Sequence, residues 1–428
     1  MERMFEGYCL QTLLHTLVET ATTGDKLQPP PSRAEEDSRR PRPRGHSSGN
    51  FRDHLLREFN PKPLDQYHDL DDYPVVTDMY SNRALSLLMM PPRIFMLGAT
   101  GYLGSEFLVL LAHTFPGYPV VALLREPTSQ RIAALSAIHP NITAVEGTLD
   151  SGDVIQRQAA EADIVINAAS SDHSPSVKAI LQGLEKSSLA RPGQPPLYIH
   201  VSGCGIVSDD ARGEPVEHVQ EWSDIGLDLN KCPPTNMHLE CDIPITKAGT
   251  RTDVPIRTII LYPGQIYGVG EGIQKTTLWL RIFLDMTKKV GHAGTWGPGA
   301  NSMNNIHVRD AAEGMLVVLK AALEGKADEG AEGHYFLTSM ERKVSYREWT
   351  QVFGDILHTK GIIKEAGTRP MPPEVVEPLG HYGWSLLGGN QFTKPERLAR
   401  LGWVPKHSAE LSLLDSLPAA IDVALEEF

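Results

Sequence analysis

The sequence predicts an α/β fold, in which a doubly wound parallel sheet carries helices on both faces and a smaller C-terminal lobe follows. Three observations support this prediction. Short apolar runs alternate with segments whose apolar residues recur at helical spacing. The apolar runs are continuous, which is typical of strands buried on both faces of a parallel sheet. With 428 residues, of which 41% are hydrophobic, the chain is long enough to bury such a core.

The predicted elements follow one another from residue 90, where the composition changes sharply. The apolar run at residues 94–97 predicts the first strand, and apolar residues at helical spacing from 103 to 115 place a helix directly after it. Further strands are expected at residues 118–124, around Val145, and at 164–168, 197–201 and 256–261, with a helix at 177–189. After Pro263 helices and loops replace the regular alternation, which predicts the second lobe.

This pattern divides the chain into three regions. Residues 1–89 are expected to be an N-terminal extension, partly disordered because residues 28–50 consist largely of Pro, Arg, Ser, Glu and Gly and have almost nothing to bury. Residues 90–263 are expected to form the sheet domain, since the first strand follows Met90 almost at once. Residues 264–428 are expected to form the second lobe and to return some elements to the core of the sheet domain.

Composition argues against several classes of function. The formal net charge of −13 argues against nucleic-acid binding by the molecule as a whole. The four cysteines are too few for a disulfide scaffold and lack metal-ligand spacing, so no metal site is expected. No apolar run reaches the roughly 18 residues of a membrane helix. Glu2 and Glu6 argue against a signal or transit peptide, so a cytoplasmic protein is expected.

A glycine-rich turn follows the first predicted strand. Gly98 permits a tight turn, Gly101 lets the backbone approach a pyrophosphate, and Gly104 allows close packing of helix on strand. The N-terminus of the next helix then faces the phosphates. The context predicts a Rossmann-type dinucleotide-binding domain. Its predicted cofactor-binding residues in this turn are Gly98, Thr100, Gly101, Tyr102, Leu103 and Gly104.

Arg125 bears on which dinucleotide is bound. It follows the second predicted strand, about twenty residues past the last glycine, where an acidic residue would bind the adenosine ribose hydroxyls of NAD. A guanidinium instead suits a 2′-phosphate, so NADP is favoured, with NAD as the alternative. The competing interpretation is a surface arginine that pairs with Glu126.

At this point the sequence resembles the short-chain dehydrogenase/reductases in their extended and atypical forms, close to the NAD-dependent epimerase/dehydratase group. The segments that carry the resemblance, besides the glycine turn, are residues 162–169, 198–203, 261–268, 304–310 and 401–405. The resemblance implies that Asn167, Ala168 and Ala169 end a strand beneath the cofactor and that Pro263 lies near the nicotinamide. It also implies an active-site hydroxyl at Ser202, although the register leaves Gly203 or Cys204 at that position as alternatives.

The sequence departs from this family at its catalytic pair, because no Tyr-x-x-x-Lys occurs anywhere in the chain. The corresponding stretch holds His238 and Asp242, with the same spacing, and this His-x-x-x-Asp pattern resembles an atypical, largely fungal branch. On a helix the two side chains would share a face. Asp242 would then accept hydrogen bonds from the ribose hydroxyls. Its negative charge would raise the pKa of His238 and favour the imidazolium, which is a better proton donor than base. Pro244 supports the alternative that both are ordinary polar residues.

The sequence therefore predicts an NAD(P)-dependent oxidoreductase that acts on a carbonyl or secondary alcohol of a small organic molecule. Its predicted catalytic residues are His238, Asp242 and Ser202. The alternative is a non-catalytic NAD(P)-binding sensor, which the loss of Tyr-x-x-x-Lys supports, and a sugar-nucleotide epimerase or dehydratase is a weaker alternative. A small-molecule substrate is the expected partner, with neither nucleic acid nor membrane, and a homo-oligomer is left open.

Overall fold

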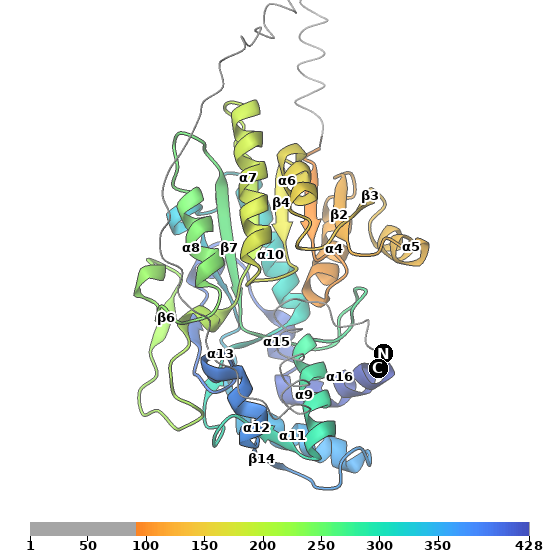
Figure 1. Cartoon of the computed structure of the whole chain (residues 1–428), viewed down its shortest axis with the longest axis vertical. Coiled ribbons are helices and arrows are strands. Elements are labelled where there is room, and N and C mark those ends of the chain that lie inside the picture. Colours follow the sequence, from red (N-terminus) through yellow and green to blue (C-terminus); the bar gives the residue numbers. More distant parts are fainter. Residues whose placement is uncertain (1–90, 428) are drawn as a thin grey trace, which may run out of the picture. The chain divides into compact units, whose positions relative to one another are not determined.

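The computed structural model describes residues 91–427, so the predicted extension at residues 1–89 lies outside the described residues. Its centre is a parallel sheet of seven strands in the order β12-β7-β5-β4-β1-β2-β3 (Figure 1). The strands are β1 (Ile94–Leu97), β2 (Val120–Leu124), β3 (Ile142–Glu146), β4 (Ile164–Asn167), β5 (Leu197–Val201), β7 (Arg257–Pro263) and β12 (His334–Leu337). The predicted α/β fold is confirmed, and strand boundaries differ from the prediction by a few residues.

Helices connect the strands and cover both faces of the sheet. They are α4 (Tyr102–Thr114), α5 (Ser129–Ile138), α6 (Gly152–Glu161), α7 (Ser174–Ala190), α8 (Leu239–Ala248) and α10 (Val308–Leu323). Ile94 and Met96 of β1 share one core cluster with residues of α4 and α10. Phe95 and Leu97 lie in a second cluster with residues of α6, α7 and α8. Because successive strand residues point to opposite faces, the continuous apolar run of β1 serves both cores.

The strand order reverses at β1. The chain runs from β1 through β2 to β3 on one side, and then crosses to β4, β5 and β7 on the other. In open α/β sheets ligands bind outside the carboxyl ends of the strands at such a reversal. The turn after β1 and the segment after β4 are therefore the first place to look for a functional site.

A smaller C-terminal lobe is built around a third apolar cluster. Its helices are α9 (Leu278–Val290), α11 (Tyr346–Thr359), α12 (Pro373–Val376), α13 (Gly380–Leu387), α14 (Glu396–Arg400), α15 (Lys406–Glu410) and α16 (Leu413–Glu426). Short strands pair as β8 (Gln265–Tyr267) with β11 (Asn305–His307), β9 (Ala293–Thr295) with β14 (Thr368–Pro370), β10 (Ser302–Met303) with β13 (Val344–Ser345), and β6 (Glu221–Ser223) with β15 (Phe392–Lys394). The remaining turns of 3₁₀ helix are η3 (Cys204–Val207), η4 (Leu229–Lys231), η5 (Gly330–Glu332) and η6 (Glu377–Leu379).

Two features connect the lobe to the sheet. β12 lies beyond the predicted boundary at residue 263, yet it is an edge strand of the seven-stranded sheet and pairs with β7. β6 belongs to the long excursion between β5 and α8 and pairs with β15 near the C-terminus. Across residues 91–427, the structure contains no helix with the length and apolar character of a membrane span.

Candidate functional site

The glycine turn after β1 is held against the end of β4. Gly98 has a φ of +84°, and a Cβ there would lie 2.5 Å from the backbone carbonyl carbon of Ala168. A Cβ on Gly104 would lie 2.1 Å from the carbonyl oxygen of Gly98. Both glycines are therefore required by the protein's own packing. A Cβ on Gly101 would meet only the Gly98 oxygen, at 3.3 Å, so the backbone of Gly101 remains approachable from outside.

The N-terminus of α4 offers hydrogen-bond donors to an anion. Gly101 is its N-cap and supplies no side-chain acceptor, and the first turn of α4 contains no acidic residue. The backbone N–H groups of Tyr102 and Leu103 thus lie at the positive end of the helix dipole. The Leu103 side chain packs in the core, and only its backbone faces this end. The N–H of Gly101 itself donates to the carbonyl oxygen of Gly98 at 3.0 Å, so the N–H groups of Tyr102 and Leu103 are the donors that fit a pyrophosphate group.

Tyr102 contributes to the turn differently from what its position in the motif suggested. Its side chain is buried, and its hydroxyl donates a hydrogen bond of 2.6 Å to the carbonyl oxygen of Gly268. Burial raises the pKa of Tyr102 well above its ordinary value, so the phenol stays neutral. The carboxylate of Glu106, one turn further along α4, accepts the N–H groups of Glu271 and Gly272. These contacts fasten the loop that follows β8 onto the start of α4.

Arg125 follows the end of β2 and is exposed. The alternative of a surface arginine that pairs with Glu126 stays open, and the carboxylate of Glu126 also lies 3.6 Å from Arg131. The position remains suited to a phosphate on the adenosine ribose.

β4 ends at Asn167, whose side-chain amide is buried. Asn167 is fully buried, and its Oδ1 accepts the N–H of Ala169 at 3.1 Å. Its Nδ2 donates to the carbonyl oxygen of Ser170 at 3.3 Å and lies 3.2 Å from Nδ1 of His200. All polar atoms of this side chain are therefore engaged by the protein. Asn167 shapes the segment beneath the predicted cofactor, and its neighbours Ala168 and Ala169 supply the surface there. Pro263 ends β7 and pairs through its backbone with Leu337.

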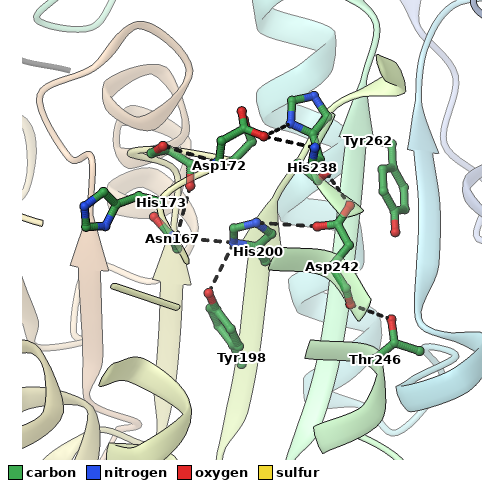
Figure 2. A network of polar contacts seen from close by, with 12 residues as sticks. Asn167, Asp172, His173, Tyr198, His200, His238, Asp242, Thr246 and Tyr262 are labelled. Atoms are coloured by element: carbon green, nitrogen blue, oxygen red, sulfur yellow. Dashed lines mark hydrogen bonds and ion pairs between the residues drawn. The ribbon is translucent and has the colours of Figure 1, made fainter. Parts of the chain in front are cut away.

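His238 lies at the entrance to α8 in an unusual backbone conformation. It is the N-cap of that helix with a φ of +72°, in the left-handed region that non-glycine residues rarely adopt. Its Nδ1 is 2.8 Å from Oδ1 of Asp172, and its backbone N–H donates to the same oxygen at 3.0 Å. Figure 2 shows the two side chains directed at each other. One carboxylate oxygen thus fixes both the backbone and the ring of His238.

This arrangement corrects the expected pairing of His238 with Asp242. Because His238 precedes α8 with left-handed torsions, the two side chains do not share a helix face, and Asp172 is the residue bonded to the ring. Asp242 lies in the first turn, is 0% exposed, and accepts the Ser202 hydroxyl at 2.7 Å. The expected contact of Asp242 with ribose hydroxyls is therefore excluded by burial. α8 continues through Pro244, so that proline does not end the helix.

Charge and burial set the protonation states around His238. Burial lowers the pKa of His238, but the hydrogen bond and negative charge of Asp172 outweigh it, so the net pKa is raised. Burial raises the pKa of Asp172, but the hydrogen bond to His238 and the charge of that ring outweigh burial. The net pKa of Asp172 is lowered, so its carboxyl stays ionised. Burial raises the pKa of Asp242 to about 7, although the charge of His238 and the Ser202 hydroxyl oppose the rise. The imidazolium form of His238 is thus more favoured than in an ordinary histidine.

The ring of His238 lies against two glycines, Gly203 and Gly205, of the turn that follows β5. A Cβ on Gly203 would come within 2.8 Å of Nε2 of His238, and one on Gly205 within 3.1 Å. Nε2 has no hydrogen-bond partner among residues 91–427, and the side chain is 9% exposed. Cys204 between these glycines directs its Sγ to the carbonyl oxygen of Tyr262, and burial raises its pKa to about 12. The buried Cys204 thiol is therefore poorly suited to act as a nucleophile or as the family hydroxyl, and Ser202 is kept as the proposed hydroxyl.

Two residues of this site were missed from the sequence. Asp172 follows β4 in the polar stretch after Ala169, and its position at the carboxyl end of a central strand was the available signal. His200 interrupts the apolar run of β5, and its Nε2 lies 3.7 Å from Oδ1 of Asp242. A histidine in a fully buried strand is unusual enough to have marked the position. Tyr267, in contrast, packs under the lobe and donates to the carbonyl oxygen of Leu411.

Comparison with known proteins agrees with this picture at the level of the fold. Residues 90–184 match the model of the NmrA-like family. An oxidase named ucsJ from an Acremonium species is 28% identical over 335 residues, covering 74% of this chain and 93% of the relative. An uncharacterised protein of Schizosaccharomyces pombe is 22% identical, covering 76% of this chain and 98% of its own length.

Solved structures share the fold at low sequence identity. A dTDP-glucose 4,6-dehydratase of Bacillus anthracis in complex with NAD has a TM-score of 0.55 at 15% identity, covering 78% of this chain and 98% of that one. The Streptomyces venezuelae dehydratase DesIV, with NAD bound, has a TM-score of 0.55 at 18% identity, with coverage of 78% and 97%. A UDP-glucose 4-epimerase of Thermotoga maritima has a TM-score of 0.52 at 14% identity, covering 78% of this chain and 99% of that one. The described part of the chain thus has the Rossmann-type fold of the NAD-dependent epimerases and dehydratases, with an NmrA-like match limited to residues 90–184.

Proposed function

We propose that this protein binds a nicotinamide dinucleotide and catalyses hydride transfer between it and a carbonyl or secondary alcohol of a small organic molecule. The observation that carries the proposal is the imidazole of His238, held by Asp172 beside the carboxyl ends of β4 and β5. In this fold those strand ends adjoin the place where a dinucleotide lies. The naming of a relative as an oxidase and the NAD in related structures agree with it.

The residues that would hold the cofactor are those of the glycine turn. The N–H groups at the start of α4 would bind the pyrophosphate, and the bare backbone of Gly101 would allow its approach. Arg125 would bind a 2′-phosphate, which favours NADP over NAD. When bound, the nicotinamide supplies or accepts the hydride, and all proton handling is left to the protein.

His238 would hold the proton that a carbonyl oxygen needs on reduction. Its Nδ1 is bonded to Asp172, so the proton available for transfer is the one on Nε2. The charge of Asp172 favours the imidazolium, which makes His238 a better donor than base and suits reduction over oxidation. Ser202 would supply a second hydrogen bond to the same oxygen. This pair replaces the Tyr and Lys that the resembled family uses.

The proposal is tested by following NADPH absorbance with a panel of aldehydes and ketones. His238→Ala should lower turnover about a hundred- to ten-thousandfold while NADPH affinity stays nearly unchanged. His218→Ala is the matched control, because that side chain is 91% exposed. A panel carbonyl that is reduced equally well by both variants would remove His238 from the mechanism.

A non-catalytic dinucleotide sensor is the second candidate, and the absence of Tyr-x-x-x-Lys favours it. It predicts that NADPH binds with ordinary affinity but that no carbonyl of the panel is ever reduced. Sugar-nucleotide epimerisation is the weaker third candidate, because its support is a shared fold at 14% identity. Incubation with UDP-glucose and analysis of the sugar would test it directly.

A further inference from the structure

A chain of buried polar groups runs from the end of β4 to Ser202 through hydrogen bonds and one longer polar contact, that of His200 with Asp242. The first group whose orientation can be assigned is the amide of Asn167. Its Oδ1 accepts the backbone N–H of Ala169, and a backbone N–H can only donate. The other end of the amide is therefore the Nδ2 group, which lies 3.2 Å from Nδ1 of His200 and donates to it.

This donor fixes the tautomer of His200. Nδ1 has one lone pair and accepts from Asn167, and the hydroxyl of Tyr198 lies at the same distance of 3.2 Å. Burial lowers the pKa of His200 to about 3, so the ring is neutral and carries its one proton on Nε2. That N–H faces Oδ1 of Asp242 at 3.7 Å (Figure 2). Within residues 91–427 both of these buried atoms lack any closer partner.

The other oxygen of Asp242 faces Ser202. Oγ of Ser202 lies 2.7 Å from Oδ2, and the Ser202 residue is 6% exposed. A hydroxyl has a single proton to donate. When Asp242 is ionised, that proton is directed to Oδ2, and Ser202 can only accept from a substrate. When Asp242 is protonated, the N–H of His200 keeps Oδ1 as the acceptor, so the carboxyl proton lies on Oδ2 and points to Oγ. The proton of Ser202 is then free.

We propose that Asp242 and His200 are positioning residues that decide whether Ser202 donates a hydrogen bond to a substrate carbonyl or accepts one from a substrate alcohol. The inference rests on the proposed oxidoreductase function and deepens it. A protonated Asp242 prepares the site for carbonyl substrates, and an ionised Asp242 prepares it for alcohols. His200 gives the switch its direction, because without its N–H the carboxyl proton could occupy either oxygen.

The surroundings of Asp242 place this switch near neutral pH. Burial raises the pKa of Asp242 to about 7, while His238 and the Ser202 hydroxyl hold it lower than burial alone would. Several titratable and charged groups interact electrostatically with Asp242 or with its direct neighbours. They are His238, Asp172, Tyr198, His200, Tyr262, Cys232 and Cys241. Of these, Asp172 opposes ionisation of Asp242 and His238 favours it. As pH rises through the pKa of Asp242, Ser202 changes from donor to acceptor.

The first test needs no substrate, so it stays decisive if the proposed function is wrong. Infrared difference spectra of the full chain between pH 5.5 and 8.5 should contain a carboxylic-acid C=O band that is absent in Asp242→Asn. Ser202→Ala should shift that band, because the carboxyl proton loses its acceptor. Asp150→Asn is the matched control, since Asp150 also lies beside a histidine but is half exposed. A band that Ser202→Ala leaves unmoved, or no band assignable to Asp242, would overturn the proposal.

The second test uses 4-nitrobenzaldehyde with NADPH as the carbonyl probe. In the native chain its KM should rise by about three- to tenfold between pH 6 and pH 9, the value of one neutral hydrogen bond. Asp242→Asn should show the low KM at both pH values, because His200 directs the amide oxygen to itself and the NH₂ group to Ser202. Ser202→Ala should show the high KM at both and keep the pH profile of kcat. In Asp242→Asn that profile should keep its shape but move to lower pH, because the charge of Asp242 contributes to the raised pKa of His238. A KM in Asp242→Asn that still depends on pH would refute the switch. If the aldehyde is not reduced at all, the proposed function fails, and the infrared test alone decides the hydrogen-bond chain.

Discussion

Replacing Asp172 by Asn tests the electrostatic basis of the proposed chemistry most directly. The amide can still accept the Nδ1 proton of His238, so the ring stays in place, but the negative charge is lost. Asp172 is 20% exposed and His238 9%, so solvent screens the 2.8 Å contact only partly. A hydrogen bond to a charged group contributes about 1.5–3 kcal/mol. This corresponds to about a ten- to hundredfold change in the protonation equilibrium of His238.

The sign of the effect follows from the raised pKa of His238. Carbonyl reduction needs the imidazolium, so activity is full below that pKa and fades as pH rises through it. In Asp172→Asn the same loss should begin at lower pH. At alkaline pH, turnover should fall about ten- to a hundredfold below that of the native chain, while at acidic pH the two should agree closely.

The assay pairs a pH–rate profile with an NMR titration of His238 in the absence of substrate. Asp150→Asn, which removes the carboxylate 3.2 Å from His173, serves as the control for loss of a neighbouring charge. If the midpoint of the His238 titration is the same in Asp172→Asn and in the native chain, the ion pair does not govern its protonation. The electrostatic part of the mechanism would then be wrong, whatever the rates show.

Three further predictions concern the cofactor and the chain around it. Arg125→Asp should move the preference from NADPH towards NADH by roughly ten- to a hundredfold in measured Kd values, and equal losses for both would rule out a 2′-phosphate contact. Gly104→Ala should lower the Tm, since its Cβ would lie 2.1 Å from the Gly98 oxygen, whereas Gly101→Ala should spare the Tm and weaken dinucleotide binding. If Gly101→Ala binds NADPH normally, the turn is not the pyrophosphate site. A chain that begins at Met90 should remain soluble with unchanged NADPH affinity in a titration, and aggregation would show that residues 1–85 are needed for folding.

The strands and the glycine turn could be predicted from the sequence because their determinants are local. The run from Ile94 to Leu97 is apolar at every position, and β1 begins and ends at those residues. The following glycines have no other common use in that context. β7, in contrast, extends to Pro263, two residues beyond the predicted end at 261. A proline is tolerated there because it ends the strand.

The candidate catalytic arrangement could not be predicted because its determinants are distant in the chain. The left-handed φ of His238 is maintained by Asp172, 66 residues away, through two hydrogen bonds to one oxygen. A spacing of four suggested a shared helix face for His238 and Asp242, and this inference fails when the first residue precedes the helix. The burial of Asp242 likewise depends on β5, which presents Ser202 and His200 to it. Spacing identified His238 and Asp242, but neither Asp172 nor His200, which are the residues that contact them.

The position of β12 at the edge of the sheet limits where the chain can be truncated or joined to a relative in a chimaera. Residues 334–337 are supplied by the chain after the lobe has begun, and their backbone pairs with β7 from Ile260 to Pro263. A gene fragment ending at residue 263 would leave the edge of β7 that faces away from β5 unpaired and would remove the buried rings of Tyr335 and Phe336 from two different cores. Such a fragment would be prone to associate through that edge. We therefore expect substrate preference to be exchanged more readily by replacing loops than by joining two proteins at residue 263. Chimaeras joined there should express poorly unless β7 and β12 come from the same parent.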